Sequence, residues 1–171
     1  SIFGEDGQPD ITNITVTPGV VLPNQAFTIS ANIEGATTAT LVYRVMFGAE
    51  VTVAMTNTGG DGWSANLPGA SEGTLIRYRI ESDVEFAPFA GDSINYFGLV
   101  VSPTDIVDNT LPVLQLFYDP ADLAFITSPE QVLIKTKIEV IVAYGNQVVD
   151  NAEMRVRGGD FGRVNFPKQS F

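Results

Sequence analysis

The chain has 171 residues, is 44% hydrophobic and carries a formal net charge of -11 at pH 7. It contains neither cysteine nor histidine, which excludes disulfides, the common zinc sites and catalysis by Ser-His-Asp or Cys-His groups. Its acidity should repel nucleic acid and anionic membranes, and it has no long apolar run. We therefore expect no nucleic-acid partner and no membrane insertion.

The charge is unevenly distributed along the chain. Up to Ile134 there are 3 basic and 16 acidic residues, a net charge of -13, whereas from Lys135 onward there are 6 basic and 4 acidic residues, a net charge of +2. Such a change in charge balance predicts two physical units.

Residues 11–101 consist of short segments in which apolar and polar residues alternate, separated by turn residues every ~8 to 12 positions. Seven such segments over ~90 residues predict an antiparallel β-sandwich of the size of an immunoglobulin (Ig) or fibronectin type III domain, which we place at residues 1–102. The clearest inward rows are Phe27, Ile29, Ala31 and Ile33; Leu41, Tyr43, Val45 and Phe47; and Ile76, Tyr78 and Ile80.

Three features of the sandwich have both a structural and a functional interpretation. Trp63 lies on an alternating strand, which favours a core residue over a carbohydrate-stacking platform. The loop Gly59-Gly60-Asp61-Gly62 lacks the spacing of an EF-hand calcium loop, so a hairpin turn is favoured. Glu81, Asp83 and Glu85 alternate at a spacing of two, which predicts a solvated strand face, with a surface calcium site as the alternative.

The residues after the sandwich predict a linker at 103–110 and a second unit at 111–171. A strand is expected from Leu111 to Tyr118, and Asp119-Pro120 predicts an N-cap and a short helix to about Thr127. A long strand is expected from Val132 to Tyr144, followed by a hairpin partner. This unit is too small to form an independent core, so we expect it to lean on the sandwich or on further sequence. The predicted fold class is mainly β: an Ig-like or fibronectin III-like sandwich followed by an incomplete β-rich segment with one short helix.

Residues 10–101 resemble a known class of domain. The segments TVTP, LVYRVMFG, VTVAMTN, WSANLPG and GTLIRYRIESD are similar to the bacterial Ig/fibronectin III-like domains that accompany catalytic domains in secreted proteins. The resemblance implies an exported bacterial protein with an extracellular or cell-surface location.

Residues 111–171 resemble another family. The segments LPVLQLFYD and YGNQVVDNAEMRVRGGDFGRVNFPKQSF are similar to the N-terminal part of the spore-coat protein H (CotH) kinase family, with its R-x-R-G turn followed by P-K-x-S-[FY]. The resemblance implies ATP-dependent phosphorylation with Mg²⁺ in the parent protein, and no cofactor for these 171 residues alone. Glycines allow close approach to phosphates and fixed cations hold them. The nucleotide-binding residues implied by the resemblance are Arg155, Arg157, Gly158, Gly159 and Lys168.

The basic C-terminal segment also has a simpler interpretation. Arg155, Arg157, Arg163 and Lys168 together form an exposed basic hairpin that covers an acidic neighbour. The tripeptide Asp160-Phe161-Gly162 spells the metal-binding motif of protein kinases, but it does not follow a His-Arg-Asp catalytic loop, so we interpret it as a chance match.

The sequence thus predicts a non-catalytic Ig-like accessory module joined to the start of a CotH-like atypical kinase domain. The 171 residues themselves are expected to be inactive and to contain no catalytic residue or metal ligand. The expected partner is the remainder of the parent chain or a neighbouring subunit. The alternative is a structural or adhesive extracellular protein that assembles through β-strand pairing, and further sandwich repeats in the parent reading frame would favour it.

Overall fold

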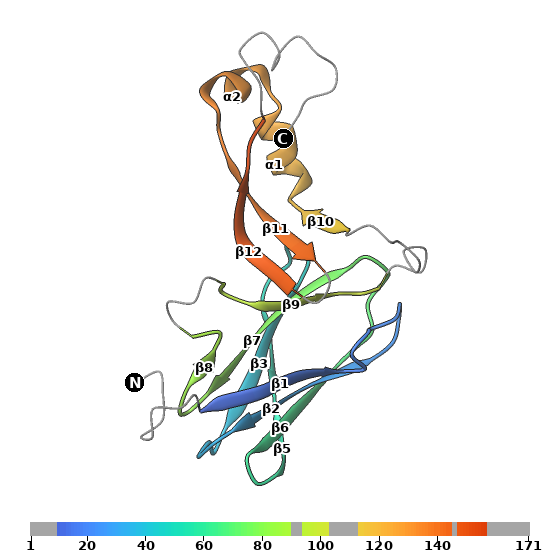
Figure 1. Cartoon of the computed structure of the whole chain (residues 1–171), viewed down its shortest axis with the longest axis vertical. Helices are drawn as coiled ribbons and strands as arrows, with labels where there is room; N and C mark the ends of the chain where they lie inside the picture. The colour runs from blue at the N-terminus through green and yellow to red at the C-terminus, as the bar shows by residue number, and fades with distance from the viewer. Residues whose placement is uncertain (1–9, 90–93, 103–112, 145–146, 157–171) are drawn as a thin grey trace.

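A computed structural model of the chain describes residues 10–89, 94–102, 113–144 and 147–156. Figure 1 shows two units, a β-sandwich and a smaller C-terminal unit of one sheet with two helices. The protein is mainly β and its sheets are antiparallel, as the sequence predicts.

Two sheets form the sandwich. One has the strand order β1-β2-β6-β5, and the other has the order β4-β3-β7-β8, with β9 also pairing with β7. This is the order of an Ig sandwich with strands A, B, E and D in one sheet and C′, C, F and G in the other. The strands are β1 Ile11–Thr17, β2 Phe27–Ile33, β3 Ala39–Val45, β4 Val51–Ala54, β5 Thr56–Gly59, β6 Gly62–Leu67, β7 Leu75–Ser82, β8 Phe86–Ala87 and β9 Phe97–Val100.

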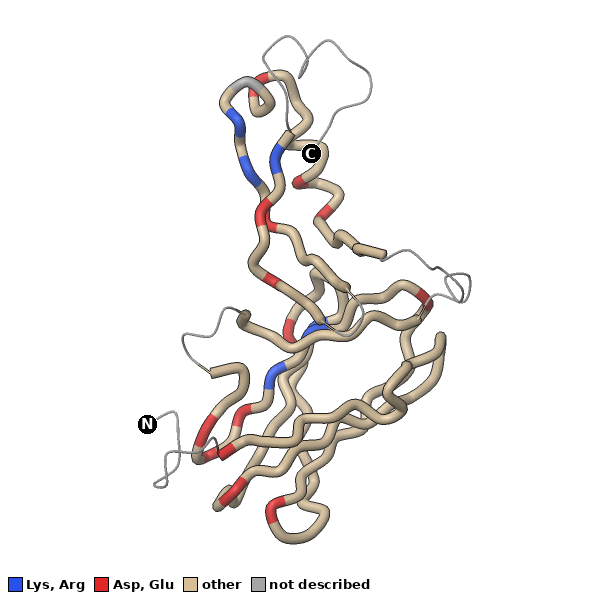
Figure 2. The backbone as a smooth tube through the Cα atoms, viewed as in Figure 1, with Lys and Arg blue, Asp and Glu red and all other residues tan. Residues whose placement is uncertain are grey.

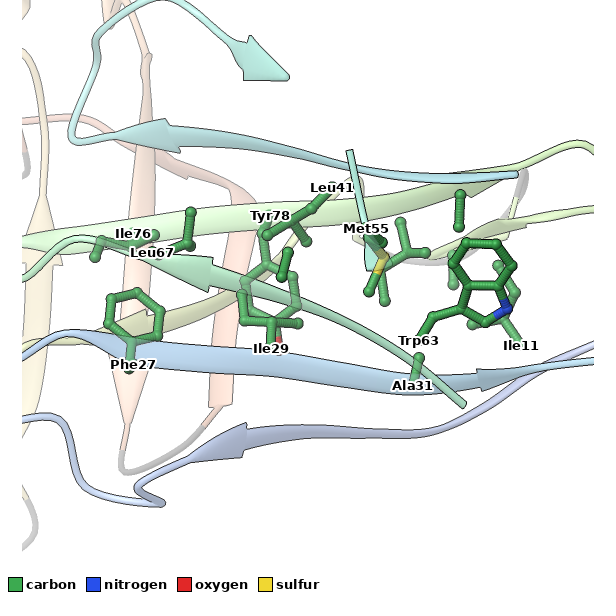
Figure 3. Close-up of a cluster of buried hydrophobic side chains, with 14 of the residues drawn as sticks. Ile11, Phe27, Ile29, Ala31, Leu41, Met55, Trp63, Leu67, Ile76 and Tyr78 are labelled. Carbon is green, nitrogen blue, oxygen red and sulfur yellow. The ribbon is translucent and has the colours of Figure 1, made fainter. Parts of the chain in front are cut away.

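The rows of Phe27 to Ile33 and of Ile76, Tyr78 and Ile80 face one another between the sheets and form one apolar core (Figure 3). The row predicted from Leu41 is correct only for Leu41 and Tyr43, because Val45 is exposed and Phe47 packs outside this core. Ile29, Leu41 and Ile80 are fully buried in it, and Trp63 is buried as predicted. Burial raises the pKa of Tyr78 to about 12 because the phenolate loses solvation there. The two-residue turn between Gly59 and Gly62, which pair with each other, confirms the predicted hairpin.

The C-terminal unit has a three-stranded sheet of order β10-β11-β12. Helix α1 agrees with the predicted helix: the Asp119 carboxylate caps it by accepting a hydrogen bond from the Ala121 N–H at 2.8 Å. The elements are β10 Leu114–Phe117, α1 Pro120–Ile126, α2 Pro129–Ile134, β11 Ile138–Tyr144 and β12 Gln147–Met154.

The long strand predicted from Val132 is wrong in its first half, and a second helix takes its place. Ser128-Pro129 repeats the cap-and-proline signal that starts α1, so a new helix begins there. Lys135 ends α2 in the left-handed conformation, with a φ of 61°. The strand therefore starts only at Ile138, and Val132 packs into the core of the unit from the helix.

Candidate functional site

Of the five residues predicted to bind nucleotide, one is described. Arg155 directly follows β12, and its side chain is exposed. Arg157, Gly158, Gly159 and Lys168 lie outside the described residues, as do the linker predicted at 103–110 and the tripeptide at 160–162. The nucleotide site therefore stays a prediction.

Arg155 belongs to a small basic region at the end of the C-terminal unit that is farthest from the sandwich (Figure 2). Lys135, Lys137 and Arg155 are all exposed there. Lys137 forms an ion pair with Glu153 across the β11-β12 ladder. Exposed pairs of this kind contribute about 0 to 1 kcal/mol, so the charges remain accessible to solvent and to ligands.

The C-terminal sheet is held against the sandwich by an apolar contact that we call the seam. It consists of one face of β10-β11-β12 packed on the outer face of β7 and β9. The buried members are Leu75, Ile141, Ala143 and Val148, with Phe47, Val100 and Phe117 packed around them. The sequence-based expectation that this unit leans on the sandwich is therefore confirmed.

Gly98 allows the two units to approach closely at the seam. A Cβ atom at this position would lie 2.7 Å from Cγ2, 2.8 Å from Cβ and 2.9 Å from Cγ1 of Val148. Because Val148 is β-branched and all three atoms are equally close, no rotation of its side chain relieves the overlap. The glycine is thus required by packing and not by a turn.

A polar contact extends the seam. The Asn95 N–H donates a hydrogen bond to the Asp150 carboxylate at 3.0 Å. Between the pairs Val142–Val149 and Val140–Ala152, β12 has one residue more than β11. This bulge keeps Val149 and Ala152 on one face of the sheet while Asp150 points to the sandwich.

A network of arginine and aromatic side chains covers the outer face of β7 beside the seam. Arg79 donates to both carboxylate oxygens of Glu50 and, at 2.9 Å, to the Tyr96 hydroxyl, which in turn donates to Glu50. The Tyr96 ring lies 5.5 Å from the guanidinium of Arg77 and 5.4 Å from that of Arg79, and Arg77 also faces the Phe47 ring at 5.8 Å. These contacts fix Tyr96, and with it the entry to β9.

The Arg79 hydrogen bonds, followed by that of Tyr96, lower the pKa of Glu50 to about 2. Arg77 has 6% of its surface exposed and donates a hydrogen bond to the Met46 carbonyl at 3.0 Å, while its Nε has no partner in the described part of the chain. Burial is the main cause that lowers the pKa of Arg77, followed by the nearby positive charge of Arg44. The negative charge of Asp150, on the other side of the seam, raises it. The charge of Asp150 in the C-terminal unit therefore acts on Arg77 in the sandwich.

Sequence reasoning did not identify this network. In the sequence, Arg77 and Arg79 only alternate with Ile76, Tyr78 and Ile80 of the core row, which by itself predicts no contact between them. A signal was present, because Arg44, Arg77 and Arg79 are the only basic residues before Lys135. Arg44 and Arg77 are also cross-strand partners.

The prediction that Glu81, Asp83 and Glu85 share a solvated strand face is wrong. Glu81 lies in β7 and pairs with Arg79 at 2.7 Å. Asp83 lies in the following turn, where its carboxylate accepts a hydrogen bond from the Thr37 N–H at 3.0 Å, and the Thr37 hydroxyl lowers its pKa. The chain reverses between β7 and β8, so the alternation of side chains between the two faces of β7 ends at Ser82.

Glu85 is buried and joins the two sheets. Its carboxylate accepts hydrogen bonds from the N–H groups of Asp10 at 2.8 Å and Ile11 at 3.2 Å. Burial raises its pKa against the effect of these two bonds. The role of Glu85 is thus to hold the start of β1.

Within the described residues no cluster of three or more acidic side chains is arranged to hold a metal ion. No helix among them is both long and apolar enough to cross a membrane. No protein-family model matches the chain, and no curated protein matches it. The contact that the described residues define most clearly is the seam, which holds the C-terminal unit against the sandwich.

Proposed function

We propose that the chain is a non-catalytic Ig-like accessory module fixed to the start of a CotH-like atypical kinase domain of an exported bacterial protein. The sandwich supplies the support, and residues from 111 onward supply the first elements of the kinase-like domain. ATP and Mg²⁺ act in the parent protein, and these 171 residues alone transfer no phosphoryl group.

The observation that carries this proposal is the seam. A sandwich that only preceded a neighbouring domain would need no matched contact with it, because domains joined by a linker move independently by default. Here Gly98 meets Val148 without space for a Cβ atom, and Asn95 binds Asp150. Such a contact fixes the direction in which the exposed Arg155 end projects from the sandwich.

The test is phosphoryl transfer by the full protein that contains this chain. Lys168→Ala should abolish most of the transfer while leaving the fold intact, because a cation is needed where negative charge accumulates on the phosphates. The matched control is Lys135→Asn, which removes a cation from the same unit at a left-handed position that asparagine tolerates.

Unchanged transfer by the Lys168→Ala protein would refute the assigned role of the lysine. A full protein that transfers no phosphoryl group, and whose gene encodes further sandwich repeats, would favour the structural or adhesive alternative. Calorimetry of the 171-residue chain with Mg-ATP should give no dissociation constant below about 100 μM, which corresponds to about -5.5 kcal/mol.

A further inference from the structure

No described residue covers one half of a sheet face in the C-terminal unit. The face opposite the seam carries an apolar patch that we call the open face, with side chains from all three strands. Register places Leu114 beside Tyr144, and Leu116 and Val149 beside Val142. The exposed fractions are 62% for Leu114, 48% for Leu116, 50% for Tyr144 and 43% for Val149.

The other half of the same face is the core of the unit. Ile138 and Val140 of β11 are buried there with Ile126 of α1 and Val132 of α2. Val142 lies between this core and the open face and packs against the core. The open face is therefore a continuation of an existing core and not an isolated apolar patch, and a contiguous patch of this kind indicates a docking surface.

The chain leaves the described part of the structure from this core. Val156, the last described residue, is buried in the same cluster. The fifteen residues that follow contain four apolar side chains of the size that a sheet face accommodates, Phe161, Val164, Phe166 and Phe171. At ~3.3 Å per residue they can reach roughly 50 Å, well beyond the ~27 Å length of the eight-residue strand β12.

We propose that residues 157–171 dock on the open face and extend the core of the C-terminal unit along it. The segment carries three basic residues and one acidic residue, so it is also attracted by the net negative charge of the rest of the chain. The proposal deepens the proposed function, since it assigns these residues to the same domain as β10–β12. The test of docking needs no kinase activity, so the docking proposal and the proposed function can fail independently of each other.

Limited trypsin digestion of the 171-residue chain tests the docking. Trypsin sites follow Arg157, Arg163 and Lys168, and cleavage of a docked segment depends on how often it opens. Replacing Leu114 and Leu116 together by Asp should speed cleavage after Arg163 at least tenfold. Because neither side chain belongs to the core of the sandwich, the thermal midpoint of the sandwich should not change.

The matched control replaces Val20 and Leu22 by Asp. These residues are exposed on the sandwich to a similar extent, and their replacement should leave cleavage after Arg163 unchanged. Cleavage of the unmodified chain as fast as that of the isolated 157–171 peptide would overturn the proposal, as would equal effects of the two double variants. Protection that grows with protein concentration, together with a dimer in sedimentation, would instead show that a second copy covers the open face.

A nitroxide label gives an independent measurement on the folded chain. The protein has no native cysteine, so Tyr144→Cys provides a unique attachment site on the open face. The label should broaden the amide resonances of Val164 and Phe166. Sharp resonances for both residues would contradict docking.

Discussion

Gly98 is the residue on which contact between the two units depends most directly. Gly98→Ala should lower the free energy of unfolding by about 1 to 3 kcal/mol, because the added methyl group overlaps Val148 in a packed contact. Chemical denaturation of the full chain measures this change. The control is Gly19→Ala, where a Cβ atom would meet nothing within 4 Å.

A second substitution distinguishes this overlap from a backbone effect. Combining Gly98→Ala with Val148→Ala removes two of the three overlapping atoms, Cγ1 and Cγ2 of Val148. The double variant should therefore lose less stability than the sum of the losses in the two single variants. Strict additivity would show that Val148 is not what the alanine meets.

Glu50 provides a test that depends on protonation. Its pKa should be about 2, below its ordinary value of 4.5, and Tyr96→Phe should raise it, because the hydroxyl donates to the carboxylate. A folded pKa below the unfolded one stabilises the fold above pH 4.5, and this stabilisation is lost as the pH falls toward 2. Because Glu50 has 39% of its side chain exposed, the loss should stay below about 1 kcal/mol.

The measurement is NMR titration of the Glu50 carboxyl carbon in the native protein and in the Tyr96→Phe variant. A pKa near 4.5 in the native protein would contradict the network. Glu50→Gln should remove the corresponding part of the acid sensitivity.

At the scale of elements, Trp63 on β6 anchors one end of the sandwich core. Trp63→Ala should cost roughly 3 to 5 kcal/mol, because a large side chain is lost from a packed interior. The indole N–H has no hydrogen-bond partner among the described residues, so Trp63→Phe removes an unsatisfied donor and should cost less than the alanine variant. Thermal unfolding of both variants checks this order, and a near-zero cost for Trp63→Ala would mean that the indole is not part of the core.

The sandwich elements could be predicted from sequence where apolar and polar residues alternate along a strand. In Phe27–Ile33 burial follows this alternation with a period of two, and in Leu75–Ser82 the residues Ile76, Tyr78 and Ile80 form the inward row. The second helix was not predicted because Val132 and Ile134 fit a strand pattern as well as a helix, although Ser128-Pro129 carries the same cap-and-proline signal as Asp119-Pro120. Strand β11 is buried on both faces, with Ile141 and Ala143 on the seam side and Val140 on the other side, and local alternation does not indicate the second buried face.

The predicted nucleotide site is the part of the sequence analysis that the described residues test least. Arg155 is the one described member of a set that the sequence identified by resemblance. The seam was not predicted, because Gly98 reads in sequence as an ordinary strand glycine and Asp150 as an exposed acid. Both acquire their roles from residues about 50 positions away, a separation that local patterns do not reveal.

At the scale of the whole molecule, the sandwich should fold without the C-terminal unit but with lower stability. A chain of residues 10–102 keeps both sheets and their core, yet it exposes Leu75, Val100 and Phe47. Exposing Leu75, which is otherwise fully buried, costs about 1.5 to 3 kcal/mol. Denaturation should give one cooperative transition at a lower midpoint than in the full chain, and equal midpoints would show that the seam contributes nothing to stability.

The most direct test of the account is whether the two units of the native chain share one orientation in solution. Residual dipolar couplings of backbone amides, measured separately for β1–β9 and for β10–β12, report the alignment of each unit. If the seam holds the units as one body, the two sets should give the same alignment tensor, and Gly98→Ala should make them differ. Different tensors in the native chain would contradict the account, because they would mean that the C-terminal sheet moves independently of the sandwich.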